Sequence, residues 1–487
     1  MAVIGIQAYI DLPFVTKSNI DADEVEHAHV IWALNQGIMP YRDIHQIHTP
    51  MLWIMMSPVM RCLPESVVAM IALRGLCALA FLGTYAVGLL VLREVNGALR
   101  WTHALVMLLL SLSIFFDFGF HQFRPDPFMT LCTALGILAA MRLRRAPRKN
   151  SFLCGLAFGF AVSLSPKMAP LCLLMPILCL LEWRQSRTLR PWGLVIPYGL
   201  GFVLGLAPAA MWLVGQGLFG DFRHWVLAHN VDRLNVFEYR TWQSIDRGKF
   251  LTLLALAGAL VMRRAKSTAT AEPWKPSRCL FVAAALAWLL PLIEPNHLMY
   301  NAQVFAMPGC VLATLLVARL VELDHWPWKL QSVLAALLVL CLVTGSAMRG
   351  TTLRVRGYSV PHVALQKLMD AGKSSGATCV GFAPWHPIFC RDATDLYMAW
   401  EQGPDVQGCV SPAGRRVYQE MWQRAMTEIF TKQPTMIVGA WVWESAFKDG
   451  LINREQYFNL QRLLQSRYRK AATVQGGEIG VFLHHDQ

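Results

Sequence analysis

Carboxylates and imidazoles are concentrated in a short segment near the start of the chain. Within Asn19–His29 they are Asp21, Asp23, Glu24, Glu26, His27 and His29. Asp23 and His27 are four residues apart and would share one face of a helix, with Glu24 beside them. Such groups at a membrane edge can act as a general base or bind a divalent cation through carboxylate oxygens. A plainer interpretation also stands, in which Asp21 caps a helix and acidic residues fill its first turn.

Other residues that could do chemistry are spread along the chain between apolar runs. They are His45, His48, Arg124, Asp126, Lys167, Glu294, His297 and Tyr300. Arg124 and Lys167 suit phosphate oxygens, although Arg124 could instead pair with Asp126 or with lipid head groups. Lys167 lies at the tip of a nearly apolar hairpin, where an unpartnered charge is costly. His45 and His48 also fit solvated loop residues, and Glu294 and His297 also fit a membrane boundary.

The elements that must position these residues are predicted to be membrane helices. Of the 487 residues, 55% are hydrophobic and 15% are charged, whereas soluble domains have about 25% charged residues. The composition predicts a polytopic α-helical membrane protein with about 9–11 membrane helices and some interfacial helices. Met1–Phe14 is short for a first span, and Met51–Met60 is predicted to be an interfacial helix. The remaining predicted spans are Glu65–Leu92, Trp101–Phe116, Pro127–Met141, Ser151–Leu164, Met168–Leu181, Pro191–Gly215, Phe250–Met262, Cys279–Ile293, Val304–Leu320 and Trp328–Ala347.

The loop charges predict an orientation for these spans. If the basic cluster Arg142–Lys149 is cytoplasmic, alternation leaves the cytoplasmic loops with about twice as many Lys and Arg residues as the outer loops. The polar segments then all lie on the outer side, although they are far apart in sequence. These segments are Asn19–Pro64, Asp117–Asp126, Ser165–Lys167, Asp221–Lys249, Glu294–Asn301 and the tail after Arg349. The net charge of +13 is therefore explained by topology and anionic lipid, and nucleic-acid binding is not expected.

The composition divides the chain into a membrane domain, 1–349, whose first outer loop is 18–65, and a small α/β domain outside the membrane, 350–487. In the second domain, apolar and β-branched content predicts strands at Ala377–Phe382, Thr435–Trp443 and Ile479–His484. Periodicity predicts helices at Pro361–Ala371, Arg415–Phe430 and Arg454–Ser466. The sequence leaves open whether two of Cys379, Cys390 and Cys409 form a disulfide.

The ordered set of outer motifs resembles that of the GT-C glycosyltransferases. It begins with Asp23-Glu24, Gly37, Tyr41-Arg42-Asp43 and His48-Thr49-Pro50, and it continues with Arg124-Pro125-Asp126, Lys167, Glu294–His297 and Tyr300. It is most similar to the bacterial branch that includes protein O-mannosyltransferases and the lipid A aminoarabinose transferase. The resemblance covers about the first 350 residues. One departure is the N-terminus, where only about 17 residues precede Ser18, against about 20 needed for a span.

The resemblance implies inverting transfer of a sugar from a polyprenyl-phosphate carrier to an acceptor outside the cytoplasm. That acceptor would be lipid A, another envelope glycolipid, a glycan or a protein. It also implies a bacterial cytoplasmic (inner) membrane location, with the active site and the C-terminal domain facing the periplasm or exterior.

The resemblance further implies roles for single residues. Asp23, Glu24 and Asp126 are expected in catalysis, with Asp23 as the base. Arg124, Lys167, His297, Tyr300 and His48 are expected to bind donor phosphate or substrate. A divalent cation, Mg²⁺ or Mn²⁺, is a further expectation, with Asp23, Glu24 and His27 as its ligands, but one acidic loop does not decide whether a metal is used.

Two other classes of function remain open at this stage. A transporter or lipid flippase would place ionisable residues near the bilayer midplane and show related halves, whereas the middle positions of these spans are nearly free of charge and no repeat is visible. A non-catalytic envelope assembly protein could keep the same scaffold.

Overall fold

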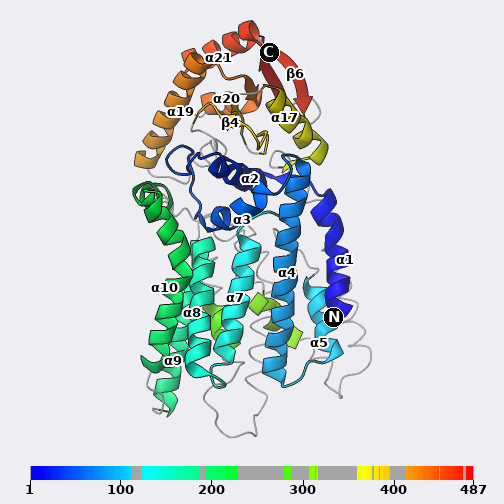
Figure 1. Cartoon of the computed structure of the whole chain (residues 1–487), viewed down its shortest axis with the longest axis vertical. Coiled ribbons are helices and arrows are strands. Elements are labelled where there is room, and N and C mark those ends of the chain that lie inside the picture. The colour runs from blue at the N-terminus through cyan, green and yellow to red at the C-terminus, as the bar shows by residue number, and fades with distance from the viewer. Residues whose placement is uncertain are drawn as a thin grey trace.

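Residues are described in the computed structural model over 2–111, 122–186, 192–228, 279–286, 307–312, 314–315, 359–375, 378–382, 384–394, 412–448, 450–474 and 479–485. Long helices form a bundle, and the C-terminal part of the chain caps one end of it (Figure 1). The helices α2 (Ala22–Asn35) and α3 (Met51–Arg61) lie between the bundle and this cap.

Each predicted span between Glu65 and Gly215 corresponds to a helix of the bundle. The bundle helices are α1 (Ala2–Lys17), α4 (Val67–Asn96), α5 (Trp101–Ser111), α7 (Asp126–Met141), α8 (Pro147–Leu164), α9 (Leu174–Ser186) and α10 (Trp192–Gly215). Between α8 and α9 the chain forms a 3₁₀ segment, η1 (Pro166–Leu173), where Pro166 and Pro170 remove backbone donors that an α-helix would use.

Two of the described helices, α4 and α10, are long and apolar enough to cross a membrane, and α7 and Pro166–Leu181 are shorter apolar helices. Large apolar side chains are exposed on both long helices, among them Leu79 at 64% and Leu200 at 63%. Contact with lipid tails costs such apolar side chains no free energy, whereas contact with water does. The apolar helices thus indicate a membrane location.

Close packing of α8 against α10 depends on glycine. Gly155 and Gly159 of α8 face the backbone of Tyr198 and Phe202, so that a Cβ atom at either glycine would lie 2.0–2.2 Å from a carbonyl oxygen. Gly201 and Gly205 of α10 make the reciprocal approach to α8. Small residues four apart are the usual means by which membrane helices come this close.

The two ends of the bundle carry different charges. At one end Glu94 of α4 pairs with Arg142 and Arg145, which follow α7. Asp126 lies at the opposite end of α7, a 16-residue helix that is about 24 Å long. The predicted separation of the Arg142–Lys149 cluster from the outer acidic segment is therefore present in the fold.

The C-terminal part is an α/β unit. Its sheet has the order β4-β3-β5-β7-β6, formed by β3 (Thr378–Val380), β4 (Arg391–Asp392), β5 (Met436–Val438), β6 (Tyr468–Val474) and β7 (Ile479–His484). β3 pairs in parallel with β4 and β5, whereas β7 pairs antiparallel with β5 and β6. The helices are α17 (His362–Ser375), α19 (Pro412–Lys432), α20 (Ala440–Lys448) and α21 (Arg454–Arg467).

One strand prediction in this unit is wrong in its second half. Thr435–Trp443 was expected to be a single strand, but β5 ends at Val438 and α20 begins at Ala440. Gly439 lies between them at φ +92°, a backbone conformation that glycine adopts readily and that breaks the strand.

Several predictions fall outside the described residues. They are the span Phe250–Met262, about half of each of the spans Cys279–Ile293 and Val304–Leu320, the span Trp328–Ala347, the segment Glu294–Asn301 and the boundary at residues 349 and 350.

Candidate active site at one end of the bundle

The acidic segment forms the N-terminus of α2. Asp21 is the N-cap: its Oδ1 accepts from the backbone N–H of Asp23 at 3.2 Å, and Glu24 Oε2 accepts from the N–H of Asp21 at 2.8 Å. This capping box satisfies donors that a helix leaves open at its start. It fixes the carboxylates of Asp21 and Glu24 relative to each other.

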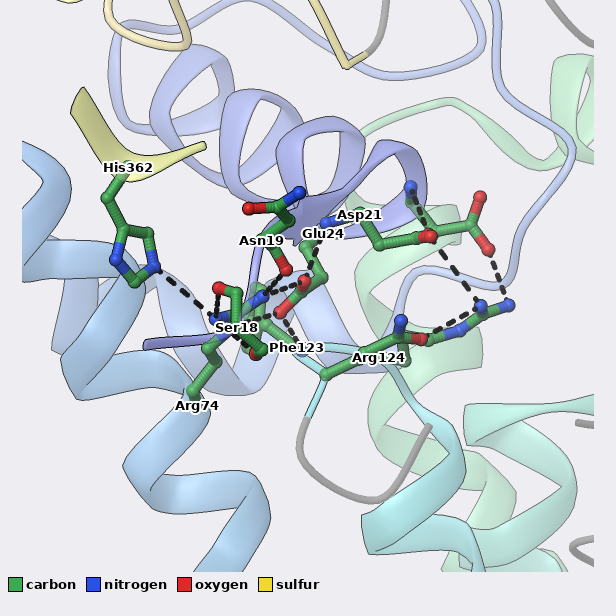
Figure 2. Close-up of polar contacts among 10 residues, drawn as sticks. Ser18, Asn19, Asp21, Glu24, Arg74, Phe123, Arg124 and His362 are labelled. Carbon is green, nitrogen blue, oxygen red and sulfur yellow. Dashed lines mark hydrogen bonds and ion pairs between the residues drawn. The ribbon is translucent and has the colours of Figure 1, made fainter. Parts of the chain in front are cut away.

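Glu24 is fully buried and is held by Arg74 of α4, a residue that the sequence analysis did not single out. Arg74 donates from Nε and Nη2 to the two oxygens of Glu24, both at 2.6 Å. It also donates to the carbonyl oxygens of Ser18 and Asn19, and the N–H of Phe123 donates to Glu24 Oε1 at 2.7 Å. Figure 2 shows Glu24 between Arg74 and Phe123. These contacts favour a positioning role for Glu24, because its oxygens are occupied by donors.

A sequence signal for Arg74 did exist. It is a lone arginine within the apolar run Glu65–Leu92, and charges in such runs are rare unless they are paired or functional.

Arg124 is the cation around which the other carboxylates gather. It pairs with Asp23 through Nη2, its Nε lies 3.4 Å from Asp126 Oδ2, and its Nη1 lies 4.0 Å from Asp21 Oδ1. The Arg124 and Asp126 side chains are only 7% and 3% exposed, whereas those of Asp21 and Asp23 are 25% and 22% exposed. The Asp23 and Arg124 segments, which the sequence predicted to lie on the same side of the membrane, are thus in direct contact, and Figure 2 shows Arg124 reaching toward Asp21.

Charge is unbalanced in this group, because three carboxylates share one guanidinium. Burial and the neighbouring Asp23 raise the pKa of Asp21 to about 7, although Arg124 opposes that rise. Asp21 can therefore take or release a proton near neutral pH. The structure adds Asp21 to the candidate bases that the sequence suggested.

Asp126 presents an unused acceptor. Its Oδ1 is buried and has no hydrogen-bond partner among the described residues, which is uncommon for a buried carboxylate oxygen. A substrate hydroxyl group would supply the missing donor.

His27 of α2 and His48, which precedes α3, lie close to each other near Arg124. The indole N–H of Trp53 donates to His27 Nδ1 at 3.1 Å, and the rings of His27 and His48 are 5.0 Å apart. His48 Nε2 lies 3.6 Å from the buried Glu26. Burial, together with the nearby His48 and Arg124, lowers the pKa of His27, which keeps its imidazole neutral.

Lys167 lies in η1, next to the bundle end that carries Asp126. Thr49, which follows His48, donates to the carbonyl oxygen of Leu164 at 2.7 Å. Thr133 of α7 donates to the sulfur of Met168 at 3.8 Å. These two contacts place η1 between the His48 segment and α7, with Lys167 half-buried. His297 and Tyr300 lie outside the described residues.

The predicted metal ligands Asp23, Glu24 and His27 are each held by another group, namely Arg124, Arg74 and Trp53. Within the described part of the chain, the group whose ligand atoms come together is a different one, His29, His386 and Asp392. A metal at Asp23, Glu24 and His27 remains a prediction.

The fold is similar to that of solved glycosyltransferases, in agreement with the GT-C resemblance of the motif order. The structure is similar to that of ArnT from Cupriavidus metallidurans bound to undecaprenyl phosphate, with a TM-score of 0.61 and 13% identity over 99% of this chain and 96% of that one. The apo state of the same protein gives a TM-score of 0.59.

A second similar structure is the Archaeoglobus fulgidus oligosaccharyltransferase tethered to an acceptor peptide. Its TM-score is 0.56 at 10% identity, covering 100% of this chain and 74% of that one. No protein-family model matches the sequence, and a search of curated proteins finds no relative.

Proposed function

We propose that this protein is a membrane glycosyltransferase that transfers a sugar from a polyprenyl-phosphate donor to an acceptor, with inversion at the anomeric carbon. The observation that carries the proposal is Arg124, a buried guanidinium at one end of the bundle with the carboxylates of Asp21, Asp23 and Asp126 around it. The two similar structures support it, since one contains undecaprenyl phosphate and the other an acceptor peptide. Both are glycosyltransferases, so the alternative of a transporter or lipid flippase is not favoured.

In the proposed reaction, Asp23 takes the proton of an acceptor hydroxyl group, and the acceptor oxygen attacks the anomeric carbon. The bond between that carbon and the phosphate oxygen breaks, and the lipid phosphate leaves with the electron pair. Arg124 and Lys167 stabilise the negative charge of the departing phosphate. The open oxygen of Asp126 accepts a hydrogen bond from a sugar or acceptor hydroxyl group.

Glu24 acts through other residues in this scheme. It holds the N–H of Asp21 and is itself held by Arg74, so it fixes the start of α2 at the reaction centre. A positioned base needs this kind of support, because small displacements of a reacting group cost large factors in rate.

The remaining assignments rest on the resemblance and belong to the same proposal. His48, His297 and Tyr300 contact donor or acceptor, the acceptor is an envelope glycolipid, a glycan or a protein, and the site faces outward from the bacterial inner membrane. A divalent cation would bind near Asp23 through oxygen ligands.

The test compares lipid-linked sugars in cells that express the wild-type chain, Asp23→Asn or Asp370→Asn. Asp370 is an exposed carboxylate on α17 and serves as the matched control. Loss of a general base slows transfer by about 10²–10⁴-fold, so Asp23→Asn should accumulate one polyprenyl-linked sugar while Asp370→Asn does not. Equal pools of every lipid-linked sugar in the wild type, in Asp23→Asn and in cells without the chain would refute the proposal.

A further inference from the structure

Two imidazoles and a carboxylate meet where α2 contacts the C-terminal unit. His29 comes from α2, Asp392 ends β4, and His386 lies in the loop before β4. Both imidazoles are fully buried, and the Asp392 side chain is 11% exposed. One ligand atom from each of the three residues lies within 4.8 Å of the others. We call this group the bridging cluster.

The imidazole of His29 lies between two hydrogen-bond acceptors, one at each ring nitrogen. Its Nδ1 lies 2.6 Å from the carbonyl oxygen of Ile388, which only accepts, so Nδ1 carries a hydrogen. Its Nε2 lies 2.7 Å from Asp392 Oδ2, which is also an acceptor when ionised. A neutral imidazole has only one N–H, so either a second proton or a metal ion must lie between Nε2 and Oδ2.

The second carboxylate oxygen of Asp392, Oδ1, also lies beside a histidine nitrogen. His386 Nε2 lies 2.8 Å from Asp392 Oδ1 and 3.3 Å from the Sγ atom of Cys379, a buried free thiol on β3. The ligand atoms of His29, His386 and Asp392 therefore gather around one point in the protein interior, and the Cys379 sulfur lies at its edge, beside His386 Nε2. The set offers four ligand atoms of the types that zinc binds.

We propose that His29 Nε2, His386 Nε2, Asp392 and the Cys379 thiolate bind one Zn²⁺ ion. Ligand atoms around a tetrahedral zinc ion lie about 3.3 Å apart, given zinc–nitrogen distances of about 2.0–2.1 Å. The distances of 2.7 and 2.8 Å from the two imidazoles to Asp392 would have to lengthen by about 0.5 Å, and the Cys379 sulfur would have to move toward the other ligands. Binding releases the thiol proton and any proton on His29 Nε2, and the two anionic ligands balance the charge of the ion.

The contact between His29 Nδ1 and the Ile388 carbonyl fits this proposal. Metal-bound histidines usually donate their other N–H to a carbonyl or carboxylate, which fixes the tautomer and the ring orientation. In the bridging cluster this outer hydrogen bond is already formed.

A zinc ion here would fasten α2 to the C-terminal unit. Four protein ligands close the coordination sphere, which is typical of a structural and not a catalytic zinc site. The start of α2 is tied to the same unit by the antiparallel pair β1 (Ile20–Asp21) and β2 (Ser359–Val360). The ion would act on the middle of α2, the helix that carries Asp23 and Glu24, and its binding does not depend on the proposed transferase activity.

The test is zinc content. The full-length chain, expressed with zinc and purified in detergent, should contain about one zinc per chain by elemental mass spectrometry. His29→Gln and Asp392→Asn should lose it, with affinity reduced by at least about 100-fold. His485→Gln, which removes an exposed imidazole from the same C-terminal unit, should retain it. A zinc-free wild-type chain, or equal zinc in all four proteins, would overturn the proposal.

A second measurement begins with the wild-type chain, so its main result does not depend on whether a variant folds. The wild-type chain, stripped with a chelator and titrated with Co²⁺, should develop the visible absorption of a tetrahedral cobalt site and a near-ultraviolet sulfur-to-cobalt band. No visible absorption would overturn the site. Cys379→Ser should keep the visible absorption and lose the near-ultraviolet band, and a retained band would overturn the place of Cys379 among the ligands.

Discussion

Replacing Arg74 with methionine would remove the cation beneath the active site while keeping a side chain of similar length. Arg74 and Glu24 are both fully buried. In Arg74→Met, Glu24 would lose two hydrogen bonds of 2.6 Å and keep the backbone N–H groups of Asp21 and Phe123 as donors. An ionised carboxylate would then remain in the protein interior without a counter-charge.

The expected cost follows from that charge. Removing one partner of a buried ion pair destabilises a protein by about 3–5 kcal/mol, a factor of roughly 10² to 5 × 10³ in the folding equilibrium. The carbonyl groups of Ser18 and Asn19 also lose a donor, but both residues are only half-buried, so water can replace it and we add nothing for them.

The assay is unfolding by a denaturant in one detergent, followed by the fluorescence of the 17 tryptophans. Arg42→Met is the matched control, because Arg42 pairs with Asp43 at the surface, where the two side chains are 53% and 38% exposed. Such pairs contribute about 0–1 kcal/mol. Arg74→Met combined with Glu24→Gln should be more stable than Arg74→Met alone, since the second change removes the buried charge.

The reasoning would be refuted by either of two results. One is equal destabilisation by Arg74→Met and Arg42→Met. The other is that Glu24→Gln makes Arg74→Met less stable, because a neutral amide leaves no charge to compensate.

Three further predictions follow from other contacts. Gly159→Ala should reduce the free energy of unfolding by about 1–3 kcal/mol and lower the thermal midpoint accordingly, because its Cβ would lie 2.2 Å from the carbonyl oxygen of Phe202. Gly199→Ala is the control and should have little effect, since a Cβ at Gly199 would have no atom within 4 Å. Folding raises the pKa of Asp21 from 3.8 to about 7, so the folded state loses stability as pH rises through that range. Asp21→Asn keeps a good N-cap and should raise the thermal unfolding midpoint above that of the wild-type chain at pH 8, but not below pH 4. Equal midpoints for the variant and the wild type at pH 8 would contradict this. Lys167→Met should raise KM for the lipid donor by about 10–100-fold, the value of a charged hydrogen bond, in steady-state transfer assays; an unchanged KM would remove Lys167 from the donor site.

Local patterns in the sequence determined the elements that do not depend on distant partners. The spans Pro127–Met141 and Pro191–Gly215 follow from long apolar runs, and the start of α2 follows from the spacing of Asp21 and Glu24 in a capping box. The order of the outer motifs was enough to predict the GT-C fold. The apolar runs and the capping box are readable because each acts within a single helix.

Only the tertiary structure determines which charged side chains pair with each other. Nothing in the sequence pairs Glu24 with Arg74, which lies 50 positions later, or His29 with Asp392, which lies 363 positions later. A buried carboxylate must find a donor wherever the fold supplies one, and that choice depends on how helices and sheet approach in space. The sequence could therefore predict that the Asp23 and Arg124 segments would lie on the same side of the membrane, but not the partners that fix the charge and position of Glu24 and His29.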